Sequence, residues 1–189
     1  MLDALLRKLE ADGLSSAIGP AAALVVALVT GVVEAAARES ADSWPEAHAV
    51  VAQAIALRGR ASRLAREDVE AHGEASAALD AATETGAAPG TGDVQLGVAL
   101  TRAADVPLHI ADAAADAAAL AALAAERVRP EFRADAAGAA LLAGGAVRAA
   151  MHLIEVNLAT ARDDARLAQA KALVVLSDAA VDRARAASN

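Results

Sequence analysis

A stretch of 21 residues near the start of the chain, from Gly13 to Val33, contains no charged side chain. It reads GLSSAIGPAAALVVALVTGVV, and about 20 apolar residues are enough to cross the ~30 Å hydrocarbon core of a bilayer. Any fold of this chain must therefore bury this segment, either in protein or in lipid.

The composition of the stretch favours burial in protein. Its strongly apolar part, Leu24 to Val33, covers about half of a bilayer crossing, and Pro20 stands before it. The chain has one Trp, one Phe and no Tyr, so it lacks the aromatic belt of membrane proteins. Asp3, Glu10 and Asp12 are unlike the basic start of a signal peptide. We expect a buried helix of a soluble, cytoplasmic protein, and a membrane span is the alternative.

Alanine indicates the fold class. The chain contains 60 alanines in 189 residues, and alanine is the best helix former. No useful length alternates β-branched and polar residues as strands do. The length suits one domain, residues 1–189. We expect an all-α, single-domain bundle of about five to six helices, some long and kinked, near residues 2–11, 20–38, 45–82 (as one helix or two), 93–128, 135–161 and from there to 187.

Charge and motifs exclude several functions. A net charge of −8, with Arg interspersed among Asp and Glu, argues against nucleic acid as a partner. The absence of cysteine removes disulfides, thiolate metal ligands and a thiol nucleophile. Four histidines without an HxxxH or ExxH pair predict no metal site, and neither a P-loop nor a GxSxG motif is present. A small-molecule site without a metal is the remaining enzymatic possibility.

Two acid–histidine pairs have helical spacing. Asp68 and His72 are four residues apart, so both side chains lie on the same face of a helix, where a carboxylate can orient an imidazole as a base. Asp105 and His109 repeat this spacing around Pro107, which frees a backbone carbonyl that could face a pocket. Each pair has a structural alternative, an ordinary surface ion pair.

Four segments, in this order and spacing, resemble the cyclodeaminase/cyclohydrolase family, the all-helical C-terminal domain of formimidoyltransferase-cyclodeaminase. The resemblance covers about residues 1–165. The segment REDVEAH is similar to the family's D-E-D-A-x-A-F turn, and AADVPLHIADAA to its A-x-x-V-P-L-x-I-A helix. The other two segments are ADAAGAALLAGGAVRAA and EVNLA, so the four matches span residues 66–72, 103–114, 134–150 and 155–159.

The resemblance implies a lyase or cyclohydrolase. A cyclodeaminase closes a formimino group onto a neighbouring nitrogen and expels ammonia, and a cyclohydrolase opens or closes the methenyl ring with water. It implies Asp68 as catalytic base or cation stabiliser, with His72 replacing the family's aromatic residue as a second catalytic candidate. Asp135, Asn157 and His109 become candidates for substrate binding. No cofactor is expected, a formimino- or methenyl-tetrahydrofolate is the candidate substrate, and the partner is a second copy in a homodimer.

The family's T-P-G-G-G-S substrate loop is altered here. The corresponding stretch reads SSAIGPAAA, in which Ser16 and Gly19 remain candidates for substrate binding. Ile18 replaces a glycine and Pro20 removes a backbone donor. The basic segment after the next helix is also missing, leaving Arg38 as the nearby cation, which weakens the case for an anionic folate. The alternatives are the same fold adapted to a different cyclisation or elimination on a less anionic substrate, and a non-catalytic helical partner protein.

Overall fold

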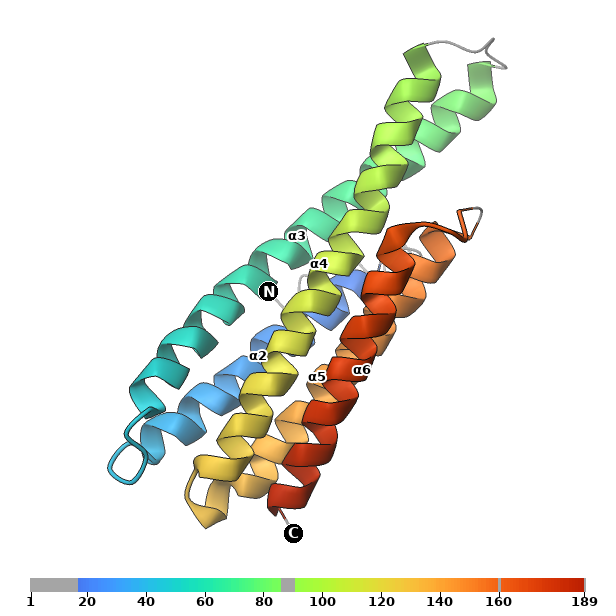
Figure 1. Ribbon diagram of the computed structural model, residues 1–189. Helices are drawn as coiled ribbons and strands as arrows, with labels where there is room; N and C mark the ends of the chain where they lie inside the picture. The colour runs from blue at the N-terminus through green and yellow to red at the C-terminus, as the bar shows by residue number, and fades with distance from the viewer. Residues whose placement is uncertain (1–16, 86–90, 160, 189) are drawn as a thin grey trace.

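The structure, a computed structural model, describes residues 17–85, 91–159 and 161–188. The helix expected over residues 2–11 and the candidate Ser16 lie outside these ranges. All regular structure in the described ranges is helical: α2 (Ile18–Glu39), α3 (Ala47–Thr85), α4 (Thr91–Arg127), the short 3₁₀ helix η2 (Pro130–Phe132), α5 (Arg133–Asn157) and α6 (Ala165–Ser188), as Figure 1 shows. The prediction of an all-α bundle of about five to six helices is confirmed.

The helix boundaries agree with the sequence patterns in most places. The segment that allowed one helix or two forms the single helix α3, and it contains Gly59 and Gly73. Pro107 lies inside α4, as expected. The structure differs at the end of α5, which stops at Asn157 rather than near Ala161. A turn follows there, with the Ala161 amide donating to the Leu158 carbonyl at 2.9 Å.

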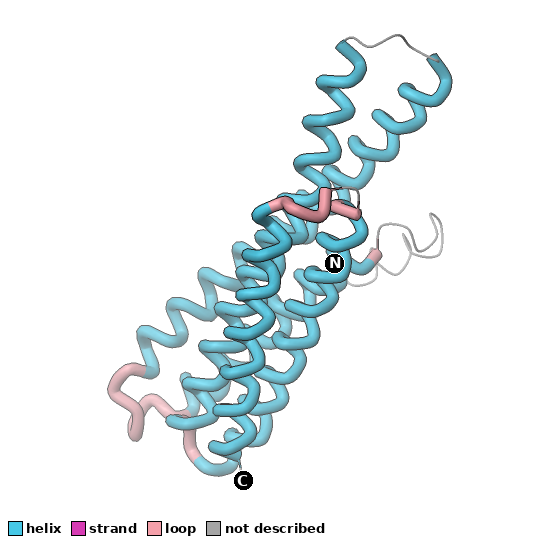
Figure 2. Tube along the Cα trace, turned by 45° about the vertical axis from the view of Figure 1, so that its right-hand side comes forward, coloured by secondary structure: helices cyan, strands magenta, loops and turns pink. Residues whose placement is uncertain are grey.

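The long helix α4 is central to the bundle and contacts α2, α3, α5 and α6. The C-terminal part of α3 and the N-terminal part of α4 continue past the other helices as an antiparallel hairpin (Figures 1 and 2). The core is rich in alanine: in α4, Ala114, Ala118 and Ala121 are fully buried. Such small side chains let helix backbones approach closely, so the alanine content that predicts helices also explains their packing.

The uncharged stretch at the start of the chain is buried on one face. Val26, Val29 and Val33 of α2 are fully buried, whereas Leu28 is 63% exposed. By length and composition, three segments could cross a membrane: Ile18–Glu39, Leu96–Arg127 and Pro130–Asn157. In this fold 72% of the most apolar window of Leu96–Arg127 is buried inside the protein. The corresponding fraction for Ile18–Glu39 is lower, at 44%. The absence of membrane contact therefore stays a prediction.

Buried polar side chains show where the core departs from ordinary packing. Thr30, Ser40 and Ser177 each donate a hydroxyl hydrogen bond to a carbonyl three or four residues earlier, and the Ser40 oxygen also accepts the Arg129 amide at 3.1 Å. Asp68 is the fourth buried polar residue, 8% exposed. Among the residues that the structure describes, none donates a hydrogen bond to its carboxylate. Burying such a group without a partner destabilises a fold, so Asp68 marks a candidate functional position.

Candidate functional site

A pocket of about 210 Å³ lies where four helices meet: the N-terminus of α2, the middle of α3, the segment of α4 around Pro107 and the C-terminal end of α5. Its polar side chains are Asp68, His72 and Asn157. Apolar and small residues complete the wall: Ala17, Ile18, Gly19, Ala71, Ala103, Pro107, Leu153 and Val156. The structure thus brings four of the predicted site residues together, namely Gly19, Asp68, His72 and Asn157.

The carboxylate of Asp68 lies directly against the backbone of Gly19. A Cβ atom built on Gly19 would fall far inside van der Waals contact with both carboxylate oxygens of Asp68. No side chain fits at position 19 unless Asp68 moves. The glycine kept from the family's loop therefore serves a purpose that its sequence context does not reveal, because it makes room for the acid on α3.

Burial raises the pKa of Asp68 from 3.8 to about 6. The cause is desolvation, which disfavours the charged carboxylate, and no cation among the described residues opposes it. A carboxyl group with a pKa near neutrality can both accept and return a proton at physiological pH. Asp68 lines the pocket, so a group that binds there can exchange a proton with it.

His72 lies one helical turn after Asp68 on α3, is half-buried, and lines the same pocket. The predicted shared face is therefore observed. In the described part of the chain, however, no hydrogen bond joins the imidazole to the Asp68 carboxylate. His72 is placed to contact a ligand in the pocket, and its predicted role as a partner of Asp68 stays a prediction.

Asn157 compensates for the proline in α4. Pro107 has no N–H, so the carbonyl of Ala103, one turn earlier, loses its usual helical donor. The Nδ2 atom of Asn157 donates to that carbonyl at 2.6 Å. This hydrogen bond ties the end of α5 to α4 at the pocket wall. The amide oxygen Oδ1 of Asn157 retains its capacity to accept a hydrogen bond from a ligand.

Arg166 at the start of α6 strengthens the same junction. Its guanidinium donates to the Thr101 carbonyl at 3.2 Å and to Asp105 Oδ1 at 2.9 Å, both on α4. It also donates to Asp164 at 2.7 Å, and this hydrogen bond is the main reason why the pKa of Asp164 falls to about 2. Asp105 therefore pairs with Arg166 in this fold, and among the described residues no hydrogen bond or ion pair joins it to His109.

Two of the predicted substrate-binding residues lie away from this pocket. Asp135 is exposed in the first turn of α5, and Asn157 ends the same helix, so the two residues are at opposite ends of the bundle. The helix begins at Arg133, and the charge of Asp135 suits the helix dipole there. His109 is exposed on α4 and does not line the pocket, although Pro107 does.

Sequence reasoning did not identify the apolar walls or the Arg166 junction. Leu153 lies one turn before Asn157, and Val156 lies one residue before it. The last turn of α5 therefore forms part of the pocket wall. The proline rule could have found Ala103, because the carbonyl that Pro107 frees lies four residues earlier. No comparable signal marks Arg166, whose partners are distant in the sequence.

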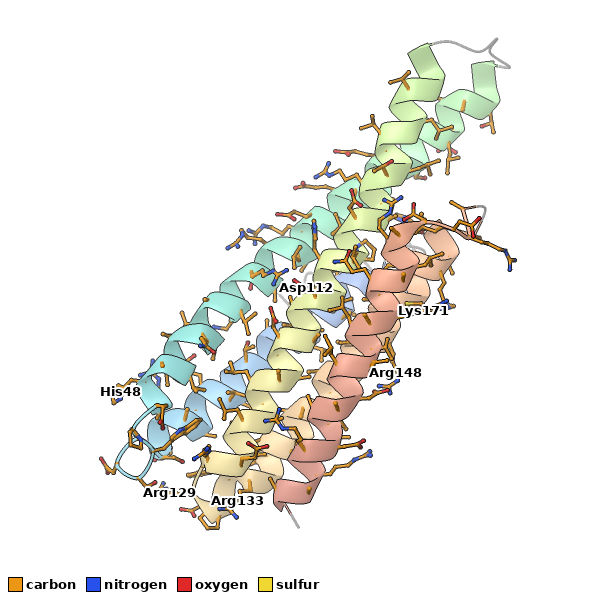
Figure 3. The ribbon with its side chains drawn as sticks, viewed as in Figure 1. His48, Asp112, Arg129, Arg133, Arg148 and Lys171 are labelled. Atoms are coloured by element: carbon orange, nitrogen blue, oxygen red, sulfur yellow. The ribbon has the colours of Figure 1, made fainter. Side chains whose placement is uncertain are left out.

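A larger groove of about 610 Å³ lies between α3 and α4, away from Asp68. Arg60 of α3 crosses it to Asp112 at 2.6 Å and to Asp116 at 3.3 Å; Asp112 lies on the side of α4 that faces α3 (Figure 3). These charges pair with one another at the surface, as solvated helix faces commonly do. The groove offers no buried, unpaired group, so the smaller pocket is the stronger candidate.

Comparisons with known proteins agree with this fold. Residues 1–174 match the family model described as formiminotransferase-cyclodeaminase. The crystal structure of formiminotetrahydrofolate cyclodeaminase from Thermotoga maritima is similar to the chain with a TM-score of 0.81 and 20% identity, over 96% of this chain and 92% of that one. No curated protein shows significant sequence similarity. Because the family model covers most of the chain, the resemblance seen in its motifs is confirmed, and this protein belongs to the formiminotransferase-cyclodeaminase family.

Proposed function

We propose that this protein is a cyclodeaminase-type enzyme in which Asp68 transfers a proton to and from a nitrogen of a small molecule bound in the pocket beside Gly19. The observation that carries the proposal is the buried carboxylate of Asp68, which has no partner among the described residues and opens onto the pocket. A fold retains such a costly group where chemistry uses it. Family membership supplies the reaction type, and the relative from Thermotoga maritima is named a formiminotetrahydrofolate cyclodeaminase.

The reaction needs one proton to move between two nitrogens. A neighbouring N–H nitrogen attacks the carbon of a protonated formimino group and forms a C–N bond. That nitrogen loses its proton, the C–NH₂ bond to the former imino nitrogen breaks, and this nitrogen leaves with the proton as ammonia. The positive charge stays on the new N–CH–N unit. One carboxylate between the two nitrogens can take the proton from the first and give it to the second.

Asp68 suits both halves of this transfer. With its pKa raised to about 6 by desolvation, it is ionised at pH 7 and also holds a proton more readily than an exposed aspartate. Its negative charge can stabilise the cationic substrate and product in the pocket. His72 and the Oδ1 atom of Asn157 border the same space and can contact the second nitrogen.

The test is ammonia release from two substrates of the same chemistry. One is 5-formiminotetrahydrofolate, and the other is N-(2-anilinoethyl)formamidine, which closes to a phenylimidazoline and carries no carboxylate. We expect turnover of at least one above the protein-free rate, and a fall of about a hundredfold or more in Asp68→Asn. Asp135→Asn is the matched control, since the same change at the far, exposed end of α5 should leave the rate unaltered.

Absence of ammonia release from both substrates would refute the proposal and favour the alternative of a non-catalytic helical partner protein. Equal loss of rate in Asp68→Asn and Asp135→Asn would also refute it, because the effect would then be general rather than local to the pocket.

We also propose that the protein is a homodimer. Exposed aliphatic residues on α2 and α5, Leu28 at 63% and Leu142 at 54%, lie on helices that contact each other. The α2 segment from Ile18 to Val33 contains no charged residue. We expect light scattering of detergent-free protein to give the mass of two chains. A monomer would remove the proposal, and a need for detergent would support the membrane alternative.

A further inference from the structure

The charge of the pocket is the basis for naming its substrate class. Of the described residues that line it, Asp68 carries a negative charge, and none is a Lys or an Arg. The remaining polar groups are the His72 imidazole and the Asn157 amide, whose nitrogen already donates to the Ala103 carbonyl. What the Asp68 and Asn157 side chains still offer a ligand is therefore mainly acceptors: the carboxylate oxygens and one amide oxygen.

Two arginines close to the pocket in the described part of the fold are engaged with acids. Arg166 pairs with Asp164 at 2.7 Å and with Asp105 at 2.9 Å. Arg102, one residue before the pocket-lining Ala103, is paired with Glu74 and Glu70 on α3, and these partners hold the pKa of its guanidinium above the ordinary value. A carboxylate of a bound ligand could pair with either of these two guanidinium groups only by displacing an acid.

The N-terminus of α2 offers little to an anion either. The first amides of a helix attract negative charge, but Pro20 has no N–H to give. The position next to Gly19 is already taken by the carboxylate of Asp68. A second anion entering here would meet that charge at close range, in surroundings where repulsion is poorly screened.

The size of the pocket limits the ligand further. Its volume of about 210 Å³ is below the ~300–1,000 Å³ of pockets that enclose drug-sized ligands. Ile18, where the family has glycine, contributes to the wall together with Leu153 and Val156. The space accepts a compact group with an apolar body, and a pteridine that carries glutamate is larger and anionic.

We infer that the pocket selects a compact substrate that presents a protonated amidine to Asp68 and has an uncharged body, and that it discriminates against carboxylate-bearing folates. This inference rests on the proposed function, because it identifies the substrate class of the same site. The amidinium places two N–H donors against the carboxylate, a charge-assisted and bidentate arrangement. The apolar walls then contact the rest of the molecule.

Binding measured by calorimetry on the full chain tests this inference without any turnover. The probes are benzamidine, its neutral isostere benzamide, its anionic isostere benzoate, and the folate 5-formyltetrahydrofolate. We expect saturable binding of benzamidine that is about tenfold or more tighter than that of the other three. Asp68→Asn should reduce the affinity for benzamidine to that for benzamide, whereas the control Asp135→Asn should not change it.

The pH dependence gives a second readout. Affinity for benzamidine should increase as the pH rises through about 6, because Asp68 ionises there. His72 of α3 is the other titratable group in the described pocket, since α2, α4 and α5 contribute none. The increase should persist in His72→Gln and vanish in Asp68→Asn.

Three results would overturn the inference: benzoate or the folate binding as tightly as benzamidine, benzamidine binding unaltered in Asp68→Asn, or no saturable benzamidine binding. None of these decides the proposed function. If Asp68-dependent ammonia release from 5-formiminotetrahydrofolate accompanies any of them, the proposed enzymatic function is supported and the inferred substrate class is refuted. If benzamidine binds through Asp68 but neither formimino substrate is turned over, the inferred binding site is supported and the proposed enzymatic function is refuted.

Discussion

Replacing Asp68 with asparagine should stabilise this protein at neutral pH. Asparagine has the shape of a protonated aspartate, so it keeps the contact with Gly19 and removes only the charge. In the folded chain burial raises the pKa of Asp68 to about 6 from 3.8, the value expected when the chain unfolds. The charged form is therefore tolerated less well in the folded protein than in the unfolded chain, and folding is penalised whenever the group is ionised.

The magnitude follows from linkage. A folded-state pKa raised above the unfolded value gives stability that is fully present below about pH 4 and is lost as the pH rises through about 6. At ~1.36 kcal/mol per tenfold change, the total loss is about 3 kcal/mol, of which about half has occurred by pH 5. Asp68→Asn avoids this loss. The variant should equal the wild type near pH 3 and exceed it by about 3 kcal/mol at pH 8.

Denaturant unfolding of both proteins at several pH values measures this difference. Other carboxylates contribute equally to the two proteins, so subtraction isolates Asp68. For a chain of this length the gain at pH 8 corresponds to a rise in Tm of roughly 6–12 °C. A constant difference across the pH range, or a variant less stable than the wild type at pH 8, would contradict the burial argument and indicate a donor that stabilises the carboxylate.

Three further substitutions test the pocket. Gly19→Ala should destabilise the fold by about 1–3 kcal/mol and reduce turnover, because its methyl group displaces Asp68. The control Gly31→Ala in the same helix, where the added Cβ meets no neighbouring atom within 4 Å, should stabilise the fold by roughly 0.5–1 kcal/mol. Equal effects of the two substitutions would refute the contact between Gly19 and Asp68. Asn157→Ala should destabilise the protein by about 0.5–1.5 kcal/mol in denaturant unfolding, because the Ala103 carbonyl loses its donor, and an unaltered midpoint would show that solvent replaces it. If His72 shares in the proton transfer, His72→Phe should lower turnover about as much as Asp68→Asn, with the double variant little worse than either. If His72 only borders the pocket, the rate should be unchanged and about 0.3–0.5 kcal/mol of stability should be lost.

The helices could be predicted from the sequence because alanine, glycine and proline act locally. A high density of good helix formers fixes the class, and Pro20 and the glycine-rich sequence at residues 86–92 indicate where helices begin and end. The end of α5 could not be placed, since alanine and leucine continue beyond Asn157 without a breaking residue. The structure ends this helix where Asn157 turns its amide to α4.

The candidate site could be predicted only in part. Asp68 was found through the resemblance to the family motif, and His72 because spacing along one helix reports a shared face. The family motif also indicated Asp135, but motif membership does not tell at which end of a 25-residue helix a side chain is useful. The contact between Gly19 and Asp68 joins two helices, and the depth at which α3 buries its acid depends on packing. Local patterns contain no information about that depth.

The contact between Gly19 and Asp68 couples two positions that mutation would otherwise vary independently. During divergence, a bare glycine in α2 is of use only while the acid on α3 persists, and the acid keeps its position at the pocket only while the glycine persists. Loss of either removes selection on the other. Among relatives of this chain, the two residues should consequently appear or disappear together, and lineages with a side chain at position 19 should have abandoned the acid and, with it, this chemistry.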